Sequence, residues 1–254
     1  MTLNPLKKSI LKQINNLGYR IEKINGDKKL VKSKKNKFTT IELVGPSGIG
    51  KTHFSEFLLN NKFTGFNPRK NLTKIEDLDM LLSNVNGLHW KLLNLKVDNL
   101  NKSNYKDITK LELINYFCSI LIQDRLLKQI NNDFHFLLDE GVVHNFASEL
   151  LQLNKDELSE LISNRLIIFL TTSNKELVYE QILKRKKDTG QEVVWQKELK
   201  KSEILAKVED SLANNKILYD KIIDNNLKAI ELDISLSHQE KLTILSSKIK
   251  EYSL

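Results

Sequence analysis

The chain has 254 residues, about the upper limit for a single hydrophobic core, so one α/β domain with appendages is expected. Hydrophobic residues make up 40% and charged residues 28%, ordinary values for a soluble globular protein. The one cysteine, Cys118, excludes an internal disulfide, and no apolar run reaches the roughly 18 residues of a membrane-spanning helix. The N-terminus lacks the apolar core of a secretory signal, which predicts a cytoplasmic protein.

The net charge of +8 is concentrated at the N-terminus. Residues 1–37 hold eleven Lys/Arg and two Asp/Glu, a balance of +9, so all the following residues together carry −1. Because that larger part of the chain is electrically balanced, specific nucleic-acid binding is not expected.

The first 37 residues are predicted to form a basic amphipathic appendage. Apolar residues recur at helical spacing over 3–17, a short strand is predicted over 19–24, and 25–26 is an Asn-Gly turn signal. We favour packing of the apolar stripe on the core, with the lysines in solvent. Peripheral contact with the inner membrane surface, or with a protein partner, is the alternative.

From residue 38 onward, apolar strands alternate with helical segments. Four strands are predicted, over 38–44, 134–139, 165–171 and 227–233. Helices are predicted over 52–60, 74–131 with breaks near 84–87 and 99–104, 143–164, 174–187, 193–225 and 237–252. Residues 28–37 are a lysine-rich connection, and 61–71 are predicted to be irregular. Strands separated by helices predict a mainly parallel sheet covered on both faces.

A phosphate-binding loop follows the first of these strands. Gly45-Pro-Ser-Gly-Ile-Gly-Lys-Thr52 fits the pattern G-x-x-x-x-G-K-[ST], known as Walker A, and lies between a predicted strand and a predicted helix. The glycines let backbone amides surround the β-phosphate, Lys51 reaches the β- and γ-phosphates, and the Thr52 hydroxyl binds Mg²⁺. The predicted cofactor, ATP or another nucleoside triphosphate (NTP), is bound by Gly45, Pro46, Ser47, Gly48, Ile49, Gly50, Lys51, Thr52 and His53.

An acidic pair ends the second core strand. Asp139-Glu140 occupies the position of the second acidic motif of P-loop proteins, called Walker B. A carboxylate there can hold Mg²⁺ opposite Thr52, so Asp139 is the second predicted metal ligand. Glu140 is predicted to polarise the attacking nucleophile or to contact substrate. The alternative for both carboxylates is a capping role at the next helix.

Basic residues gather at the end of the helix predicted over 174–187. Within this cluster, Lys184 to Lys187, we favour Arg185 as the group that stabilises charge on the transferred phosphoryl group, because guanidinium binds phosphate bidentately. The alternative is a solvated helix end that complements the helix dipole. Arg69 and Arg125 are further candidates, for binding the acceptor substrate.

The chain resembles P-loop small-molecule kinases of the thymidylate-kinase and nucleoside-kinase type. The resemblance rests on Walker A at 45–52, the acidic strand end at 139–140, and a strand followed by a basic helix after 165. It implies a three-layer P-loop NTPase domain over 38–254, with a helical insertion at about 74–131 and a lid-like segment at about 184–191. It also implies an ATP-dependent phosphotransferase acting on a small-molecule acceptor such as a nucleotide, a nucleoside, or a sugar or glycan precursor.

Two features bear on the acceptor. Thymidylate kinases typically have Asp-Arg where this chain has Asp139-Glu140, so a nucleotide acceptor is less expected than phosphoryl transfer itself. The N-terminal run from Leu6 to Arg20 looks like leaders of proteins from surface-polysaccharide gene clusters, which points to a glycan precursor. The oligomeric state is left open, and a dimer is compatible with the sequence.

Two other classes are alternatives. In a motor or switch ATPase of the additional-strand class, Asp139-Glu140 would be Walker B with its catalytic Glu, and residues 171–174 a polar sensor. Thr52 and Asp139 lie 87 positions apart, and the residues between them are mainly in predicted helices, which favours an acceptor-binding insertion and hence a kinase. A nucleotide-binding regulatory or interaction protein is the third class.

Overall fold

The computed structural model describes residues 19–24, 27–32, 40–61, 65–66, 87–129, 135–190 and 199–253. Strands β1 (Tyr19–Ile24) and β2 (Asp27–Lys32) form an antiparallel hairpin, which is a sheet of its own. The predicted strand over 19–24 is confirmed. β2 falls in the lysine-rich stretch for which only a connection was predicted, because lysine is depleted in strands and hides the pattern. The predicted helix over 3–17 and the turn at 25–26 lie outside the described residues.

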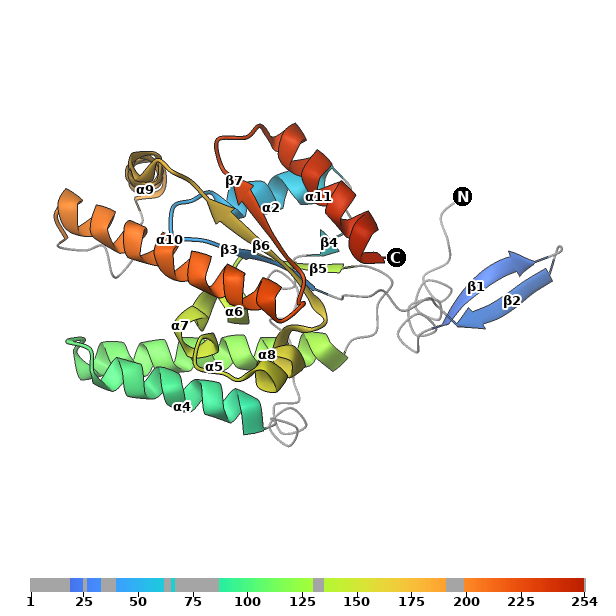
Figure 1. The fold of residues 1–254 in the computed structure, drawn as a ribbon, viewed down its shortest axis with the longest axis horizontal. Helices are drawn as coiled ribbons and strands as arrows, with labels where there is room; N and C mark the ends of the chain where they lie inside the picture. Colours follow the sequence, from blue (N-terminus) through green and yellow to red (C-terminus); the bar gives the residue numbers. More distant parts are fainter. Residues whose placement is uncertain are drawn as a thin grey trace.

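A second sheet forms the body of the chain (Figure 1). Its strand order is β4-β5-β3-β6-β7, and every neighbouring pair is parallel. The strands are β3 (Thr40–Val44), β4 (Gly65–Phe66), β5 (His135–Leu138), β6 (Arg165–Thr171) and β7 (Ala229–Asp233). The four predicted core strands are therefore confirmed. β4, which pairs with β5 at the sheet edge, lies in the segment predicted to be irregular.

Helices connect the parallel strands. They are α2 (Lys51–Asn60), α4 (Gly87–Asn101), α5 (Asp107–Gln129), α6 (Val142–Asn145), α7 (Ala147–Leu150), α8 (Lys155–Ile162), α9 (Lys175–Thr189), α10 (Lys201–Asp224) and α11 (His238–Ser253). The helix predicted over 143–164 is three short helices. Asn154 starts the last of them, because its side chain accepts from the Glu157 amide in a capping box. The described part of the predicted insertion is α4 and α5, with a break at 102–106.

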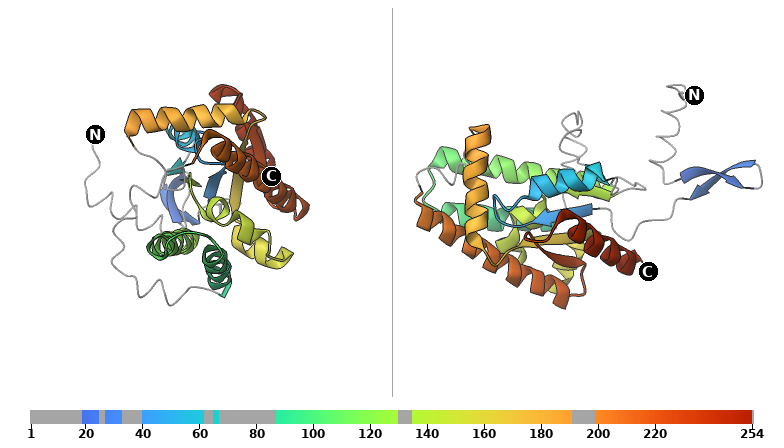
Figure 2. Two further views of the ribbon diagram at one scale, coloured as in Figure 1. Left: turned by 90° about the vertical axis from the view of Figure 1, so that its left-hand side faces the viewer. Right: turned by 90° about the horizontal axis from the view of Figure 1, so that it is seen from above.

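The sheet separates two apolar layers. Leu166, Ile168 and Leu170 of β6 pack with α2, α9, α11 and the first half of α10, whereas Ile167 and Phe169 pack with α6–α8 and the second half of α10. Figures 1 and 2 show α4, α5 and α8 on the side of the sheet opposite α2 and α11. A three-layer α/β fold results, as predicted, with the carboxyl ends of β3, β5 and β6 meeting at one edge of the sheet.

Across the described residues, no helix combines the length and the apolarity needed to span a bilayer.

Candidate functional site

The loop from Gly45 to Gly50 joins the central strand β3 to helix α2. Gly48 and Gly50 have φ angles of 86° and 94°, a region that glycine tolerates and other residues rarely adopt. A Cβ atom on Gly48 would lie 2.4 Å from Cγ1 of Ile182, so α9 packs directly on the loop. The glycines of the pattern therefore set both the turn of the loop and its contact with α9.

Lys51 is folded across the loop that precedes it. Its Nζ atom donates to the carbonyl oxygens of Gly45 at 2.7 Å and Pro46 at 3.1 Å, and its side chain is buried. Neutral carbonyl oxygens are weaker partners for an ammonium group than phosphate oxygens are. A triphosphate bound in the loop can therefore replace these carbonyl oxygens as the partner of the ammonium group.

Thr52 and Asp139 meet at the carboxyl edge of the sheet. The Thr52 hydroxyl donates to Oδ2 of Asp139 at 3.2 Å, because β3 and β5 are parallel neighbours in the sheet. A hydroxyl and a carboxylate are the oxygen ligands that Mg²⁺ prefers, and phosphates and water commonly complete its shell. The two predicted ligands thus fit this metal. No cluster of three or more His, Cys, Asp or Glu side chains suited to a metal occurs within the described ranges.

A cavity of about 300 Å³ opens beside the loop. Its lining consists of Ser47, Gly48, Gly50, Lys51, Thr52, His53, Glu140, Gln181 and Arg185. The fold thus brings three predicted features together: the Walker A loop, Glu140 and Arg185. Glu140 also accepts a hydrogen bond from the Tyr116 hydroxyl of α5 at 3.0 Å, a contact that the sequence did not indicate.

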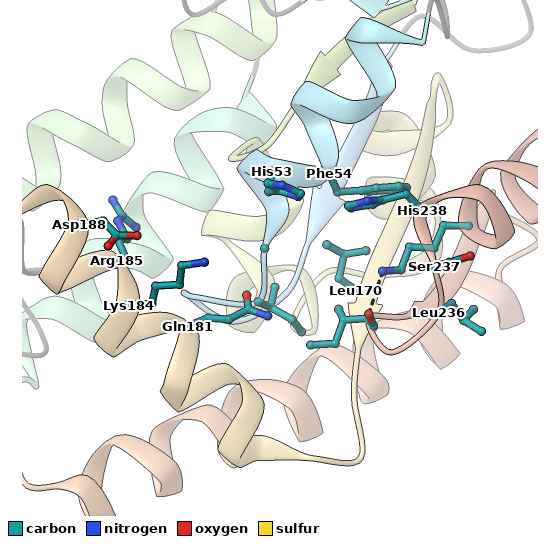
Figure 3. A pocket seen from close by; sticks show the side chains of 14 residues that line it. His53, Phe54, Leu170, Gln181, Lys184, Arg185, Asp188, Leu236, Ser237 and His238 are labelled. Carbon is teal, nitrogen blue, oxygen red and sulfur yellow. Dashed lines mark hydrogen bonds between the residues drawn. The ribbon is translucent and has the colours of Figure 1, made fainter.

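A larger cavity of about 640 Å³ adjoins the same loop (Figure 3). It lies between α2, α9 and the connection from β7 to α11, and its lining is Ile49, Gly50, His53, Phe54, Leu170, Gln181, Lys184, Arg185, Asp188, Ile234, Leu236, Ser237, His238 and Lys241. Figure 3 shows His53, Phe54 and His238 grouped at one side and Lys184, Arg185 and Asp188 on α9 at the other. Gly50, His53 and Arg185 line both cavities, so both cavities border the same phosphate-binding loop.

The ring of His238 belongs to an aromatic group at the α2 side of the larger cavity. It stacks on Phe57 with centroids 4.6 Å apart and lies 5.0 Å from the His53 ring. Partial burial lowers the pKa of His238, and the nearby His53 and Lys241 lower it further. The neutral form of the ring is therefore favoured on this wall.

A buried ionic network supports the site from behind. Arg165, the first residue of β6, contacts Oε2 of Glu42 at 3.0 Å and also pairs with Asp124. Asp124 in turn contacts Nε2 of His89 at 3.1 Å. The other oxygen of Glu42 accepts from the His144 amide at 2.9 Å, in the helix that follows Asp139-Glu140. The network thus joins the helical insertion, the central strand and the acidic loop.

The ionisation of this network follows from its burial. Loss of hydration raises the pKa of Glu42, whereas Arg165 and two backbone amides lower it. Burial likewise lowers the pKa of Arg165, and Glu42 raises it. Burial, followed by the charges of Lys128, Arg125 and Arg165, lowers the pKa of His89 to about 4. At neutral pH His89 is therefore an uncharged donor to Asp124.

The remaining predicted residues lie elsewhere or serve the backbone. Arg125 does not line either cavity described above; it lies on α5, where its charge acts on His89 and Lys128. Arg69 lies outside the described residues. In the sequence predicted as a polar sensor, Asn174 caps α9 by accepting from the Glu176 amide, and Thr172 accepts from Asn174.

Sequence reasoning missed several residues of the site. Glu42 carried a signal, since it is the one charged residue inside the apolar run of β3. The sequence held no such signal for Tyr116, His238 and Lys241, because each reaches the site only through the packing of α5 or α11.

Fold and site together define a P-loop NTPase fold with a Walker A loop, an adjacent Walker B strand and a basic helix over the loop. No protein-family model matches the sequence, and no curated protein matches it. Among solved structures, a deoxyadenosine kinase from M. mycoides with dCMP and dCDP bound is 14% identical, with a TM-score of 0.47 over 84% of this chain and 100% of that chain. A gluconokinase from Sinorhizobium meliloti 1021 is 11% identical, with a TM-score of 0.40 over 86% of this chain and 95% of that chain. Similarity at this level identifies no substrate.

Proposed function

We propose that this protein is a kinase that transfers a phosphoryl group from ATP or another NTP to a small-molecule acceptor. The observation that carries the proposal is the direct pairing of β3, which leads into Walker A, with β5, which ends at Asp139. An ATPase of the additional-strand class would have a further strand between these two. The direct pairing therefore favours the kinase class over the motor or switch class.

In the proposed complex, the amides of the loop from Gly45 to Gly50 and the N-terminus of α2 bind the phosphates. Lys51 transfers its hydrogen bonds from the loop carbonyls to the β- and γ-phosphates. Thr52 and Asp139 would hold Mg²⁺, which neutralises charge on the β- and γ-phosphate oxygens when it is bound. Their 3.2 Å contact supports a shared metal position.

Glu140 is proposed as the group that orients or deprotonates the acceptor, since it lines the cavity that holds the end of the phosphate loop. An acceptor hydroxyl gives its proton to Glu140, whereas an acceptor phosphate is only positioned by it. The acceptor oxygen then bonds to the γ-phosphorus, and the bond from that phosphorus to the bridging oxygen breaks to release the nucleoside diphosphate. Arg185 faces the same cavity and stabilises the charge on the transferred group.

The larger cavity is proposed to take the nucleoside of the donor. Its volume of about 640 Å³ lies within the range of small-molecule sites, and its aromatic wall provides a stacking surface. The acceptor would then enter from the side of α5, where Tyr116 reaches Glu140. A nucleotide, a nucleoside or a sugar or glycan precursor fits this proposal. Roles for Arg69 and Arg125 in binding it, and contact of residues 1–37 with a membrane or protein, stay predictions.

The test is turnover with a metabolite pool. Purified protein with Mg²⁺ and NTP should form nucleoside diphosphate faster when a pool of nucleosides, nucleotides and sugars is added. Lys51→Ala should abolish triphosphate binding and turnover, whereas Glu140→Gln should keep binding and lose turnover. Rapid hydrolysis that no pool accelerates would instead support the ATPase class. Nucleotide binding without any turnover would support a regulatory protein.

A further inference from the structure

Lys241 of α11 is a buried cation at the floor of the larger cavity. Its side chain lines that cavity although the residue is only 6% exposed. Its Nζ atom donates to the carbonyl oxygen of Ile234 at 2.9 Å, the dashed line in Figure 3, and lies 5.9 Å from the centre of the Phe54 ring. The ammonium group therefore lies between the aromatic wall and the connection from β7 to α11.

This contact changes which hydrogen-bonding group the floor presents. Ile234 lines the cavity, and its carbonyl oxygen already accepts one hydrogen bond, from the ammonium group of Lys241. An ammonium group carries three donors and no acceptor, so at most two N–H groups remain for a ligand. A base that reaches this end of the cavity thus meets a cationic donor.

Purine bases differ at this point of recognition. The exocyclic group of adenine is an amine, which donates and would meet another donor. The exocyclic group at the same ring position of guanine or hypoxanthine is an oxygen, which accepts. We propose that the cavity selects an NTP with a 6-oxopurine base over ATP, and that Lys241 determines this preference. The inference rests on the proposed binding of an NTP at the Walker A loop.

Burial of Lys241 makes the preference strong. Loss of hydration lowers the pKa of this lysine, whereas Asp233 and Glu240 raise it, so the ammonium group is only partly compensated. A partly desolvated cation gains more from a ligand oxygen than a solvated one does. A site built to bond one polar group also rejects the analogue that lacks it.

The decisive comparison is ITP against ATP, because the two differ at the exocyclic group and its adjoining ring proton. Dissociation constants for both, and for GTP, are measured by calorimetry with Mg²⁺ on the full chain. Binding of inorganic tripolyphosphate measures the affinity of the phosphate-binding loop without the contribution of a base. The wild type should bind ITP and GTP at least tenfold more tightly than ATP, which corresponds to about 1.4 kcal/mol.

Lys241→Met tests the residue itself. Methionine keeps the apolar length of the side chain but removes the donor, which also frees the Ile234 carbonyl to accept from the adenine amine. The ratio of the ATP and ITP constants should fall to within about threefold of one, or reverse. Because loss of one positive charge affects both triphosphates alike, the ratio isolates the base. Lys248→Met, which removes an exposed lysine of the same helix, should leave the ratio unchanged.

The outcomes separate the two proposals. Equal or tighter binding of ATP than ITP by the wild type overturns the inference and leaves the proposed function standing. A preference for ITP that persists in Lys241→Met overturns the assignment to Lys241. If none of the triphosphates and no tripolyphosphate binds, the proposed function itself is wrong. The wild-type comparison is decisive even if Lys241→Met does not fold.

Discussion

Glu42 accepts a hydrogen bond from the backbone amide of His144 at 2.9 Å, across 102 positions of sequence. The bond ties β3, which leads into the phosphate loop, to the helix that follows the acidic pair. The other oxygen of the same carboxylate binds Arg165, and neither side chain is open to solvent. One buried carboxylate thus sets the position of Asp139 and Glu140 relative to the loop.

Glu42→Ala is therefore expected to be strongly destabilising. The substitution leaves the guanidinium group of Arg165 buried with one fewer anion and leaves the His144 amide without this acceptor. Breaking a buried pair in this way lowers the free energy of unfolding by about 3–5 kcal/mol. Urea unfolding at pH 7.5 measures the change. Glu251→Ala, which breaks an exposed pair with Lys248, is the matched control and should lower it by less than about 1 kcal/mol. Equal effects of the two substitutions would contradict the structural role of Glu42.

Gly48→Ala should damage the phosphate loop. The residue has a φ of 86°, and its added Cβ would lie 2.4 Å from Ile182, so α9 or the loop must move. We expect a loss of at least about 2 kcal/mol in the free energy of unfolding, together with weaker binding of tripolyphosphate.

Gly87→Ala at the start of α4 is the control for that substitution. Among the described residues, a Cβ there meets no atom beyond its own helix within 4 Å, so the change should be neutral or stabilise by up to about 1 kcal/mol. Calorimetry and urea unfolding of both variants compare the two sites. Unaltered tripolyphosphate binding by Gly48→Ala would show that the loop does not need this close packing.

His89 predicts a pH-dependent stability. Its pKa in the folded state, about 4, lies below the ordinary 6.5, so the folded state binds fewer protons than the unfolded state. The contribution of neutral His89 to the free energy of unfolding is complete above pH 6.5. It is lost as the pH falls from 6.5 toward 4, by up to about 3 kcal/mol.

The comparison with His89→Gln isolates this effect from other acid-sensitive groups. The glutamine amide can still donate to Asp124, but it does not titrate. Urea unfolding of both proteins at pH 7.5, 5.5 and 4.5 should show the wild type losing more stability than the variant on acidification. Parallel losses in the two proteins would mean that His89 takes up protons as readily when folded as when unfolded.

Tyr116 should support the proposed role of Glu140. Glu140→Gln is expected to reduce acceptor-dependent turnover by about 100-fold or more, because the base is lost. Tyr116→Phe removes one hydrogen bond to that carboxylate and should reduce turnover by up to about tenfold, with unchanged triphosphate binding. Tyr105→Phe, at an exposed tyrosine of the nearby connection, should change neither quantity. An effect of Tyr116→Phe on triphosphate binding alone would place it in donor recognition instead.

The strands and the phosphate loop were predictable because their signals are local. The apolar run over 165–171 was predicted with the bounds that β6 has, since its side chains are buried on both faces of the sheet. The two residues of β4 were not predictable, because such a short strand exists only through its pairing with β5. The continuous helix predicted over 143–164 was wrong, because the chain is interrupted between its short helices and a local capping box at Asn154 starts the last of them.

By itself, the sequence determined the Walker A loop, the acidic strand end and the alternation of strands with helices, because each depends on residues within a few positions of one another. Only the tertiary structure decided that β5 pairs directly with β3, that Glu140 and Arg185 line one cavity, and that Lys241 lies at the floor of another. Such relationships depend on strand order and on helix packing across the sheet. Local periodicity predicts neither the strand order nor the helix packing, because the same pattern of strands and helices is compatible with several orders of the strands.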